Sequence, residues 1–393
     1  MKLHKLLAEA VVDNLKAIFS EEKFADKVIA ASLRKNAKWG SRDRKFIAES
    51  TYEIVRHYRL FFTAAGTKNP WPVFAAYLVS TGIGLPDWKE LQGISENRIK
   101  KSMQENAGFF SVEQSVPDWL DELGRRELKD KWEEEMTALN QEAKVVLRAN
   151  SLKTSANALR EQLLNHGVET VLHPDVPEAL ILLQRQNVFS LPEFKKGFYE
   201  LQDISSQRVA HFMQLKEGLR IIDACAGGGG KSLHIAALMK NKGKIISMDI
   251  RQNKLDELKK RAARAGVFNI GTRIISEENT RQLNEFADRV LLDAPCSGLG
   301  VLRRNPDAKW KLSVDAVEQV KKAQSAILFD YSKMVKIGGK LIYATCSVLP
   351  SENSGQINKF LESNPMFQVE EEKVIMPSDG FDGFYMCRMI RKG

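Results

Sequence analysis

The stretch LRIIDACAGGGGKSLHIAALMKN, residues 219–241, runs from a strand-like apolar segment through four consecutive glycines into a helix-like segment. Apolar residues at three- and four-residue spacing after Lys231 are typical of a helix. Glycine lets the backbone approach a ligand closely, and the first turn of a helix attracts anionic groups. The stretch therefore predicts a strand, a ligand-binding turn and a helix, the unit from which a parallel α/β sheet is built.

The same alternation of strand and helix continues from this stretch to the C-terminus. Strand-like segments recur at residues 243–250, 289–298 and 339–347, and helix-like segments at 252–266 and 315–336. Strands alternating with helices of this length predict a parallel sheet with right-handed crossovers. Ligands of such sheets bind beyond the carboxyl ends of the strands, where this sequence places its glycines, aspartates and cysteines.

The chain before this α/β region has a different character. Residues 1–140 show helical spacing throughout and no strand pattern, and Ser41 is placed to cap one of these helices, with Asp43 in its first turn. Residues 143–205 combine two strand-like segments with one helix. We therefore expect three domains: an all-α domain over 1–140, a small α+β domain over 143–205 and an α/β domain over 206–393.

Composition narrows the class of protein. The chain has 393 residues, of which 43% are hydrophobic, and this suits two or three globular domains of roughly 100–200 residues each. Lys and Arg number 59 against 50 Asp and Glu, and the net charge of +9 points to a polyanionic partner such as nucleic acid. No apolar run approaches the roughly 20 residues of a membrane span. The four cysteines show no C-x-x-C spacing and the six histidines no metal-ligand pattern, so we expect a reduced, cytoplasmic monomer without a metal.

Two kinds of nucleotide site fit the glycine loop. A P-loop reads G-x-x-x-x-G-K-[ST]; residues 230–232 match its end, but Cys225 stands at its first position, and VLLD at 290–293 could pass for a Walker B strand. Against this reading, the next strand ends in Asp249, twenty residues after Gly229, where an acid can accept hydrogen bonds from a ribose. The strict G-x-G-x-x-G of NAD sites is absent. The loop thus favours S-adenosylmethionine and leaves a triphosphate as the alternative.

Two thiols stand at equivalent strand ends. Cys296 follows one strand-like segment and Cys346 another, and each is followed by a serine. If the two strands are neighbours in the sheet, they lie roughly 4.8 Å apart, and both thiols face the same ligand. A single cysteine there would suit a core, but a pair beside a cofactor loop favours chemistry. Two thiols alone do not complete a tetrahedral zinc site.

A thiol beside a methyl donor suits methylation of a pyrimidine at carbon-5. This carbon is a poor nucleophile until a thiolate adds to carbon-6; after methyl transfer the carbon-5 proton leaves and the thiolate is expelled. Cysteine is suited to both steps because it is nucleophilic and also leaves well. Asp293 could hydrogen-bond or protonate the ring edge, and Lys231 could stabilise the thiolate or nearby negative charge.

These residues resemble the RsmB/Sun family of RNA (cytosine-5)-methyltransferases, related to the eukaryotic NOL1/NOP2/Sun proteins. The resemblance lies in DACAGGGGKS, the DI at 249–250, LLDAPCSGLGVLRRNPDAKW, YATCSVLPSENS and DGFDGFYMCRMI, which together span most of residues 200–393. LRANSLKT and YELQDISSQRVA are similar to the family's small N-terminal extension. Residues 1–140, above all SRDRKFIAESTYEIVRHYR, resemble the NusB-like domain of RsmB. The resemblance implies a Rossmann-like class I methyltransferase domain.

The resemblance also implies a role for each matched residue. Cys346, in the T-C-S motif, becomes the nucleophile that attacks cytosine, and Cys296 the thiol that releases the product. Asp293 would contact the base or the methyl donor, with Lys231 near the reacting groups. The expected cofactor site comprises Cys225, Ala226, Gly227, Gly228, Gly229, Gly230, Lys231, Asp249, Arg251, Glu277 and Asp293, with Asp203 and Gln207 nearby.

The sequence departs from the family pattern at two places. Gly227 and Gly228 stand where the family has Ala and Pro, so we expect a more flexible loop. After the strand-like TRIISEEN the usual aspartate for the adenine side is missing, and Glu277 is the nearest acid.

The implied substrate is RNA whose cytosine is unstacked. Ribosomal RNA of the 16S type is the first expectation, with transfer RNA as the alternative. Expected RNA contacts are Arg148, Asn150, Lys153, Arg303 and Arg304. Two other functions stay open: an RNA-stimulated ATPase that uses GGGGKS, and an RNA-binding factor without catalysis.

Overall fold

The computed structural model describes residues 3–36 and 38–392, and its chain divides into two compact units. The first unit contains the residues up to Gln141 together with Leu302–Val314, and the second contains Glu142–Val301 together with the residues from Asp315 onward. The chain thus leaves the second unit after Val301, contributes a short segment to the first and then returns. Boundaries drawn along the sequence did not predict this excursion.

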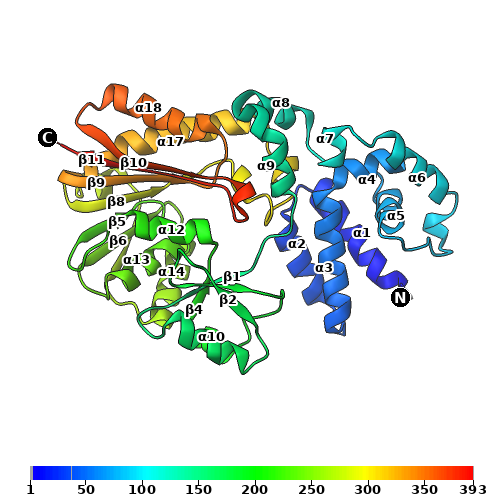
Figure 1. Ribbon diagram of the computed structural model, residues 1–393, viewed down its shortest axis with the longest axis horizontal. Helices are drawn as coiled ribbons and strands as arrows, with labels where there is room; N and C mark the ends of the chain where they lie inside the picture. Colours follow the sequence, from blue (N-terminus) through cyan, green and yellow to red (C-terminus); the bar gives the residue numbers. More distant parts are fainter. Residues whose placement is uncertain (1–2, 37, 393) are drawn as a thin grey trace. The chain divides into compact units, whose positions relative to one another are not determined.

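The first unit is built from helices, labelled in Figure 1. They are α1 (Lys5–Phe19), α2 (Ala25–Lys35), α3 (Ser41–Arg56), α4 (Tyr58–Ala65), α5 (Pro70–Ser80), α6 (Glu96–Glu105), α7 (Phe110–Glu113), α8 (Asp118–Leu128) and α9 (Trp132–Leu139), with 3-10 turns η1 (Lys89–Leu91) and η2 (Lys129–Lys131). Apolar residues at helical spacing, such as Leu15, Ile47 and Leu78, form one buried core. No helix in the described part of the chain is long and apolar enough to cross a membrane.

The cap predicted for α3 is wrong by one residue. Ser41 is the first helical residue, and Gly40 holds the N-cap position. The carboxylate of Asp43 accepts a hydrogen bond from the backbone N–H of Gly40 at 3.1 Å, and therefore does satisfy an N-terminal donor as its place in the first turn suggested.

The segment 302–314, which carries α16 (Ala308–Lys311), is anchored inside the helical unit. The Nζ of Lys309, fully buried, donates to the carbonyl oxygen of Arg56 at 2.7 Å and to Asn140 Oδ1 at 3.1 Å. Burial and the charge of Arg56 hold the pKa of Lys309 well below its usual value. The indole of Trp310 donates to the carbonyl oxygen of Val55 at 2.7 Å. The segment is thus an integral part of the first unit.

The second unit begins with a small antiparallel sheet. Its strands are β1 (Val146–Ala149), β2 (Thr170–Leu172), β3 (Ala179–Leu182) and β4 (Tyr199–Leu201), in the order β2-β3-β1-β4, with the helices α10 (Ala156–Leu164) and α11 (Pro192–Lys195). Leu147, Leu159 and Leu180 pack in its own small core.

The larger sheet has seven strands in the order β10-β11-β9-β8-β5-β6-β7. Their bounds are β5 (Arg220–Asp223), β6 (Lys244–Asp249), β7 (Ile270–Ile274), β8 (Ala287–Asp293), β9 (Val335–Thr345), β10 (Phe367–Ile375) and β11 (Phe384–Arg391). Strands β5 to β9 pair in parallel, and β10 and β11 add antiparallel pairs. From β5 the chain continues to β6 and β7 on one side, and β8 and β9 lie on the other side, so the direction of strand order changes at β5. Ligands of open α/β sheets bind at such a point.

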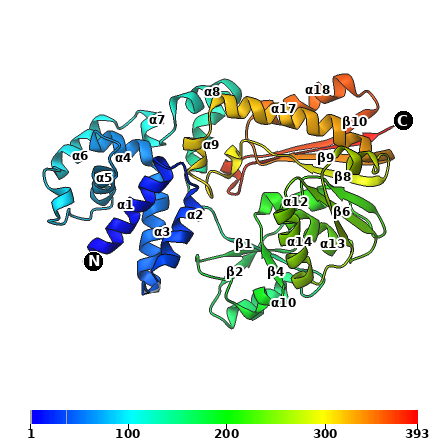
Figure 2. The same ribbon diagram turned by 180° about the vertical axis from the view of Figure 1, so that it is seen from behind.

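Helices cover both faces of this sheet, as Figures 1 and 2 show from opposite sides. Ile221 faces the core beneath α12 (Ile204–Phe212), α13 (Gly230–Leu238) and α14 (Gln252–Ala265). Its neighbour Ile222 faces the core beneath α17 (Val314–Tyr331) and α18 (Ser354–Ser363). This alternation is the two-residue period of a strand buried on both faces. The predicted α/β fold with a preceding helical domain is confirmed, whereas β10 and β11 were missed as strands. Charged residues from Glu370 to Lys373 hide the apolar alternation of β10, a device that also protects an edge strand from pairing.

Candidate active site

The two thiols predicted to act together lie side by side at the carboxyl ends of β8 and β9. These strands are parallel neighbours, with Asp293 opposite Ala344 in the register. The Sγ atoms of Cys296 and Cys346 are 3.3 Å apart, and both side chains are partly buried. Two residues fifty positions apart in the sequence thus meet because their strands pair in the sheet.

The thiol pair lies in a buried environment that acts on Cys296. The hydrogen bond to Cys346 and the burial of the side chain raise the pKa of Cys296 well above its usual value, and the charge of Glu352 adds to the effect. The raised pKa favours the protonated form of Cys296, and either sulfur can donate in the contact between the two thiols.

An ion pair connects the glycine loop to the first thiol loop. The Nζ of Lys231, in the first turn of α13, lies 2.5 Å from Oδ2 of Asp293, the last residue of β8. The same ammonium group stands 5.2 Å from the ring centroid of Phe384. Lys231 and Asp293 are thus held together within the same group of strand ends as the thiols.

The conformation of the glycine loop depends on the glycines at 227 and 229. Gly227 has φ of 52°, and no described atom lies within 4 Å of a β-carbon built at that position. Gly229 has φ of 82° and is the N-cap of α13; a β-carbon there would meet Leu258 Cγ at 2.4 Å. The loop therefore needs glycine at 229 to pack against α14, and it leaves open space beside 227.

Asp249 closes the other side of this loop. Its Oδ2 accepts from the backbone N–H of Gly227 at 3.0 Å, and its Oδ1 accepts from that of Arg251 at 2.8 Å. Each carboxylate oxygen has a second lone pair for ribose hydroxyls. The acceptor atoms of Asp249 and the open space beside Gly227 fit a nucleoside such as that of S-adenosylmethionine.

A buried carboxylate lies at the end of β5, directly before the loop. The hydroxyl of Ser232 donates to Asp223 Oδ2 at 2.6 Å and lies 2.8 Å from the hydroxyl of Ser247. Burial raises the pKa of Asp223 to about 6, and burial likewise raises the pKa of Cys225. Asp223 was not among the predicted site residues, although its place at a strand end before four glycines was a usable signal.

Of the remaining predicted cofactor residues, two form backbone hydrogen bonds within the protein and two have exposed side chains. The backbone N–H of Ala226 donates to the carbonyl oxygen of Met248 at 2.9 Å, and the carbonyl oxygen of Gly228 accepts from Arg261 at 2.7 Å. The side chains of Arg251 and Glu277 are exposed, and Glu277 pairs with Arg281 at 2.5 Å on α15 (Glu277–Arg281).

Asp203 and Gln207 belong to the helix α12. Asp203 is its N-cap, accepting from the backbone N–H of Ser205 at 2.8 Å, and the fully buried Gln207 donates to the carbonyl oxygen of Gln202 at 2.8 Å. Both residues therefore support the helix that precedes β5.

Several residues predicted to contact RNA use their donors inside the protein. Arg148 is buried and donates to the carbonyl oxygen of Gly230 at 2.7 Å and to Gln202 Oε1. The Nδ2 of Asn150 donates to the carbonyl oxygens of Gly197 and Ala265, at 2.9 and 2.8 Å. Both side chains thus tie the small sheet to the α/β domain, and their contacts with RNA stay predictions.

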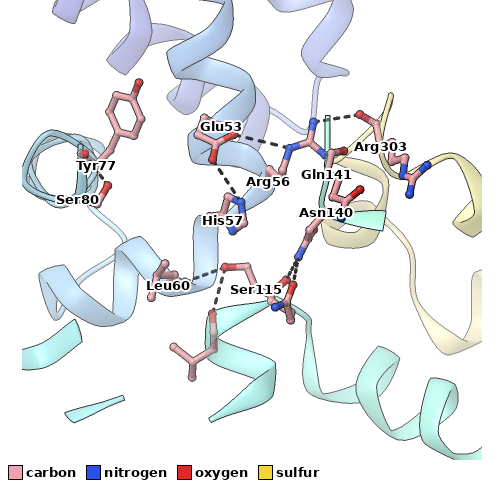
Figure 3. A network of polar contacts seen from close by, with 12 residues as sticks. Glu53, Arg56, His57, Leu60, Tyr77, Ser80, Ser115, Asn140, Gln141 and Arg303 are labelled. Atoms are coloured by element: carbon pink, nitrogen blue, oxygen red, sulfur yellow. Dashed lines mark hydrogen bonds and ion pairs between the residues drawn. The ribbon is translucent and has the colours of Figure 1, made fainter. Parts of the chain in front are cut away.

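The other predicted RNA contacts are placed differently. The exposed Lys153 donates to the carbonyl oxygens of Lys196 and Arg264, each at 2.7 Å. Arg303 is buried in the helical unit, where its Nε donates to the carbonyl oxygen of Ala138 at 2.6 Å. Figure 3 shows Arg303 there, with its own carbonyl oxygen accepting from Arg56 at 3.0 Å. These contacts hold Arg303 within the helical unit, and RNA contacts of Arg303 and of the partly buried Arg304 stay predictions.

One feature of the thiol loops was missed altogether. The carboxylate of Glu352, fully buried, accepts from the hydroxyls of Ser297 and Ser347, the residues that directly follow the two cysteines. The repetition of Cys-Ser at both strand ends was the available signal. Its partner, however, stands 55 residues from Ser297 and could not be inferred from spacing.

Among the described residues, one cluster has ligand atoms close enough for a metal ion: Glu178, His211 and His234. The Nε2 of His211 lies 2.9 Å from Glu178 Oε2, and that of His234 lies 3.9 Å from it. Burial and the nearby charge of Arg148 lower the pKa of His234 to about 3. The positive charge of Arg148, which disfavours a proton on His234, also disfavours a divalent metal ion there. The expectation that the protein binds no metal stays a prediction.

Two family models match this chain. The model described as 16S rRNA methyltransferase RsmB/F matches residues 210–386, and the model of an RsmF/B-like ferredoxin-like domain matches residues 116–189. The first match covers the glycine loop, both thiols and Glu352. It replaces the P-loop interpretation of GGGGKS.

Curated relatives carry names from the same family. A probable ribosomal RNA small subunit methyltransferase B of Bacillus subtilis is 36% identical over 270 residues, which are 64% of this chain and 60% of that protein. The ribosomal RNA small subunit methyltransferase B of Vibrio vulnificus is 31% identical over 74% of this chain and 69% of its own length. A probable one from Synechocystis is 29% identical over 91% of this chain and 89% of that protein.

Solved structures share the fold. The crystal structure of PH0851 has a TM-score of 0.84 at 22% identity, covering 99% of both chains. A methyltransferase homolog from Pyrococcus horikoshii has a TM-score of 0.64 at 24% identity, covering 72% of this chain and 98% of that one. The site geometry, the family model and the relatives agree with the resemblance read from the motifs: the chain belongs to the RsmB/F family of methyltransferases.

Proposed function

We propose that this protein methylates carbon-5 of cytosine in RNA through a covalent bond between Cys346 and carbon-6, with 16S-type ribosomal RNA as the first candidate substrate. The observation that carries this proposal is the pair of thiols 3.3 Å apart at neighbouring strand ends. A methyltransferase without covalent pyrimidine chemistry has no need of two thiols beside its cofactor loop. Family membership makes S-adenosylmethionine the methyl donor, as the glycine loop and Asp249 predicted.

S-adenosylmethionine supplies an electrophilic methyl group when bound. On the protein side, we assign the ribose hydroxyls to Asp249 and the close backbone approach to the loop from Cys225 to Gly230. Lys231 and Asp293, paired at 2.5 Å, stand between this loop and the thiols and are assigned to the reacting groups. Contacts of Arg251 and Glu277 with the adenosine stay predictions.

The two thiols divide the covalent chemistry between them. The sulfur of Cys346 adds to carbon-6, and the electron pair of the carbon-5–carbon-6 bond becomes available at carbon-5 for the methyl group. Transfer of the carbon-5 proton to a water molecule then restores the double bond and breaks the carbon–sulfur bond, so that Cys346 leaves as a thiolate. We assign Cys296 to release, because its sulfur lies 3.3 Å from that of Cys346 and an S–H group there can donate to the leaving thiolate.

The decisive experiment maps methylated cytosines in RNA from cells with and without the protein, using bisulfite sequencing. We expect one or more positions in small-subunit ribosomal RNA to lose the mark. Loss in transfer RNA instead would reassign the substrate. If no cytosine loses its mark, and the purified protein also transfers no labelled methyl group to either RNA, the proposal is wrong.

A binding experiment distinguishes the proposed methyltransferase from an RNA-stimulated ATPase. Calorimetry should show binding of S-adenosylmethionine and no binding of ATP. Binding of ATP with hydrolysis stimulated by RNA would support the ATPase in its place.

A further inference from the structure

Glu352 lies at the end of η5 (Pro350–Glu352), and none of its surface is exposed. Its Oε1 accepts from the hydroxyls of Ser297 at 2.5 Å and Ser347 at 2.6 Å. Its Oε2 accepts from the backbone N–H of Ser297 at 2.8 Å and from Nε2 of Gln324 at 2.9 Å. Two bonds to each oxygen fill the lone pairs of the carboxylate, and all the donors are neutral groups.

The donors come from the two loops that carry the thiols. Ser297 directly follows Cys296, and Ser347 directly follows Cys346. The two serine hydroxyls lie 3.3 Å apart, like the two sulfur atoms. Gln324, on α17, also donates to the carbonyl oxygen of Pro295 at 2.9 Å. One carboxylate therefore holds both thiol loops and the helix beside them in a single arrangement.

Glu352 is itself fixed to the strand that precedes Cys346. The hydroxyl of Tyr343 donates to the carbonyl oxygen of Glu352 at 2.7 Å. The next residue, Asn353, accepts from the hydroxyl of Thr345 at 2.5 Å and donates to the carbonyl oxygen of Ser347 at 3.0 Å. These residues are all buried, so the carboxylate has little freedom to move away from the serines.

The charge of this carboxylate acts on Cys296. It contributes to the raised pKa of Cys296, after the hydrogen bond to Cys346 and burial. A negative charge buried among neutral donors is weakly screened by solvent and disfavours a second negative charge nearby. Glu352 therefore opposes deprotonation of Cys296.

We propose that Glu352 is a positioning residue of this site, whose carboxylate, hydrogen-bonded to both thiol loops, sets the spacing of Cys296 and Cys346 and the reactivity of Cys296. Its catalytic meaning rests on the proposed function, because Cys346 and Cys296 are the thiols assigned there to attack and release. The reactivity of the thiols is a property of the folded protein and is measured without RNA.

The test is the variant Glu352→Gln, which keeps the size of the side chain, removes the charge and replaces one acceptor by a donor. Iodoacetamide alkylation of each thiol is followed by mass spectrometry as a function of pH, on the full chain without RNA. We expect Cys296 to be alkylated about fivefold faster, or more, near pH ~8 in the variant, because a neighbouring negative charge is gone. The matched control Glu135→Gln changes a buried glutamate of the helical unit and should leave both thiol profiles unchanged.

A wild-type pH profile for Cys296 in a Glu352→Gln protein that melts as the wild type does overturns the proposal. If Glu352→Gln does not fold, Ser297→Ala and Ser347→Ala each remove one donor to the carboxylate, leave its negative charge less compensated and should shift the Cys296 profile in the opposite direction, towards slower alkylation; unchanged profiles in both again overturn it. Methyl transfer is then measured separately. A wild-type protein without activity on any RNA would refute the proposed function, while the alkylation result would still decide the role of Glu352.

Discussion

Two buried carboxylates support the two halves of the candidate active site, and they differ in how they are satisfied. Under the thiols, Glu352 accepts four hydrogen bonds, two of them from Ser297. Under the glycine loop, Asp223 accepts a hydrogen bond from Ser232 at 2.6 Å, but its Oδ1 has no hydrogen-bond partner among the described residues. Both carboxylates accept hydrogen bonds from serine hydroxyls, but only Glu352 has hydrogen bonds to both of its oxygens.

The difference separates a preformed half from an adaptable one. The thiol half holds its two sulfur atoms at a set distance before any substrate arrives, which suits a covalent step that depends on geometry. The cofactor half has a buried acceptor in reserve and an acid whose pKa is raised to about 6 by burial. We infer that substitutions in the thiol half affect chemistry and leave cofactor binding intact, and that substitutions around the glycine loop do the reverse.

The largest effect is expected at Cys346. Cys346→Ala removes the sulfur that bonds to carbon-6, so methylation should fall by about 10³-fold or more while the affinity for S-adenosylmethionine stays unchanged. Labelled-methyl transfer and calorimetry measure the two quantities on the same preparation.

The companion variant Cys296→Ala tests the division of roles. It keeps the nucleophile and lacks the S–H donor, so a covalent protein–RNA adduct should accumulate on denaturing gels, with none formed by Cys346→Ala. Adduct with Cys346→Ala and none with Cys296→Ala would reverse the assignment.

The next effect concerns stability and tests the unsatisfied carboxylate. The pKa of Asp223 is raised from 3.8 to about 6 in the folded protein, so the folded state binds more protons than the unfolded state between these values. Stability should therefore fall as pH rises from about 4 to about 6, by up to about 3 kcal/mol, and stay lowered above that range. Asp223→Asn, which keeps an acceptor for Ser232, should lack this loss. Urea unfolding without cofactor at several pH values gives the difference, and equal slopes for the two proteins would contradict the raised pKa.

A smaller effect is expected where the two halves are joined. Lys231→Met removes the partner of Asp293 and should lower kcat/KM by about 10²-fold, as loss of one fixed charge beside reacting groups does. Asp293→Asn should act on the same ion pair. The double variant should then be much less impaired than the sum of the two single effects predicts; full additivity would show that the two residues act independently.

The smallest effect is expected at Asp249. Asp249→Asn weakens the hydrogen bonds to the ribose and to Gly227, so the affinity for S-adenosylmethionine should drop by about tenfold. The alkylation rates of both thiols should not change. Glu278→Gln, at an exposed carboxylate on α15, serves as the control and should bind the cofactor as the wild type does. A change in thiol reactivity with Asp249→Asn would break the separation of the two halves.

The sequence by itself determined the parallel α/β sheet and the residues at its strand ends. The two-residue and 3.6-residue periods, the four glycines after β5, Asp249 after β6 and the two Cys-Ser pairs are all local patterns, and local patterns are written directly in the order of residues. The family resemblance could be read from the same stretches because the chemistry sits where strands end.

The tertiary structure alone decided which of these residues touch and which donors are already used. Ser297 and Glu352 are 55 positions apart, Arg303 and the carbonyl oxygen of Ala138 are 165 apart, and Lys309 and that of Arg56 are 253 apart. Arginines read as RNA contacts turned out to bond buried carbonyl groups, and the segment after Val301 joined a different unit. The physical reason is that a buried polar group needs a hydrogen-bond partner. The packing of elements that are distant in the sequence decides which partner lies within reach, and spacing along the chain does not.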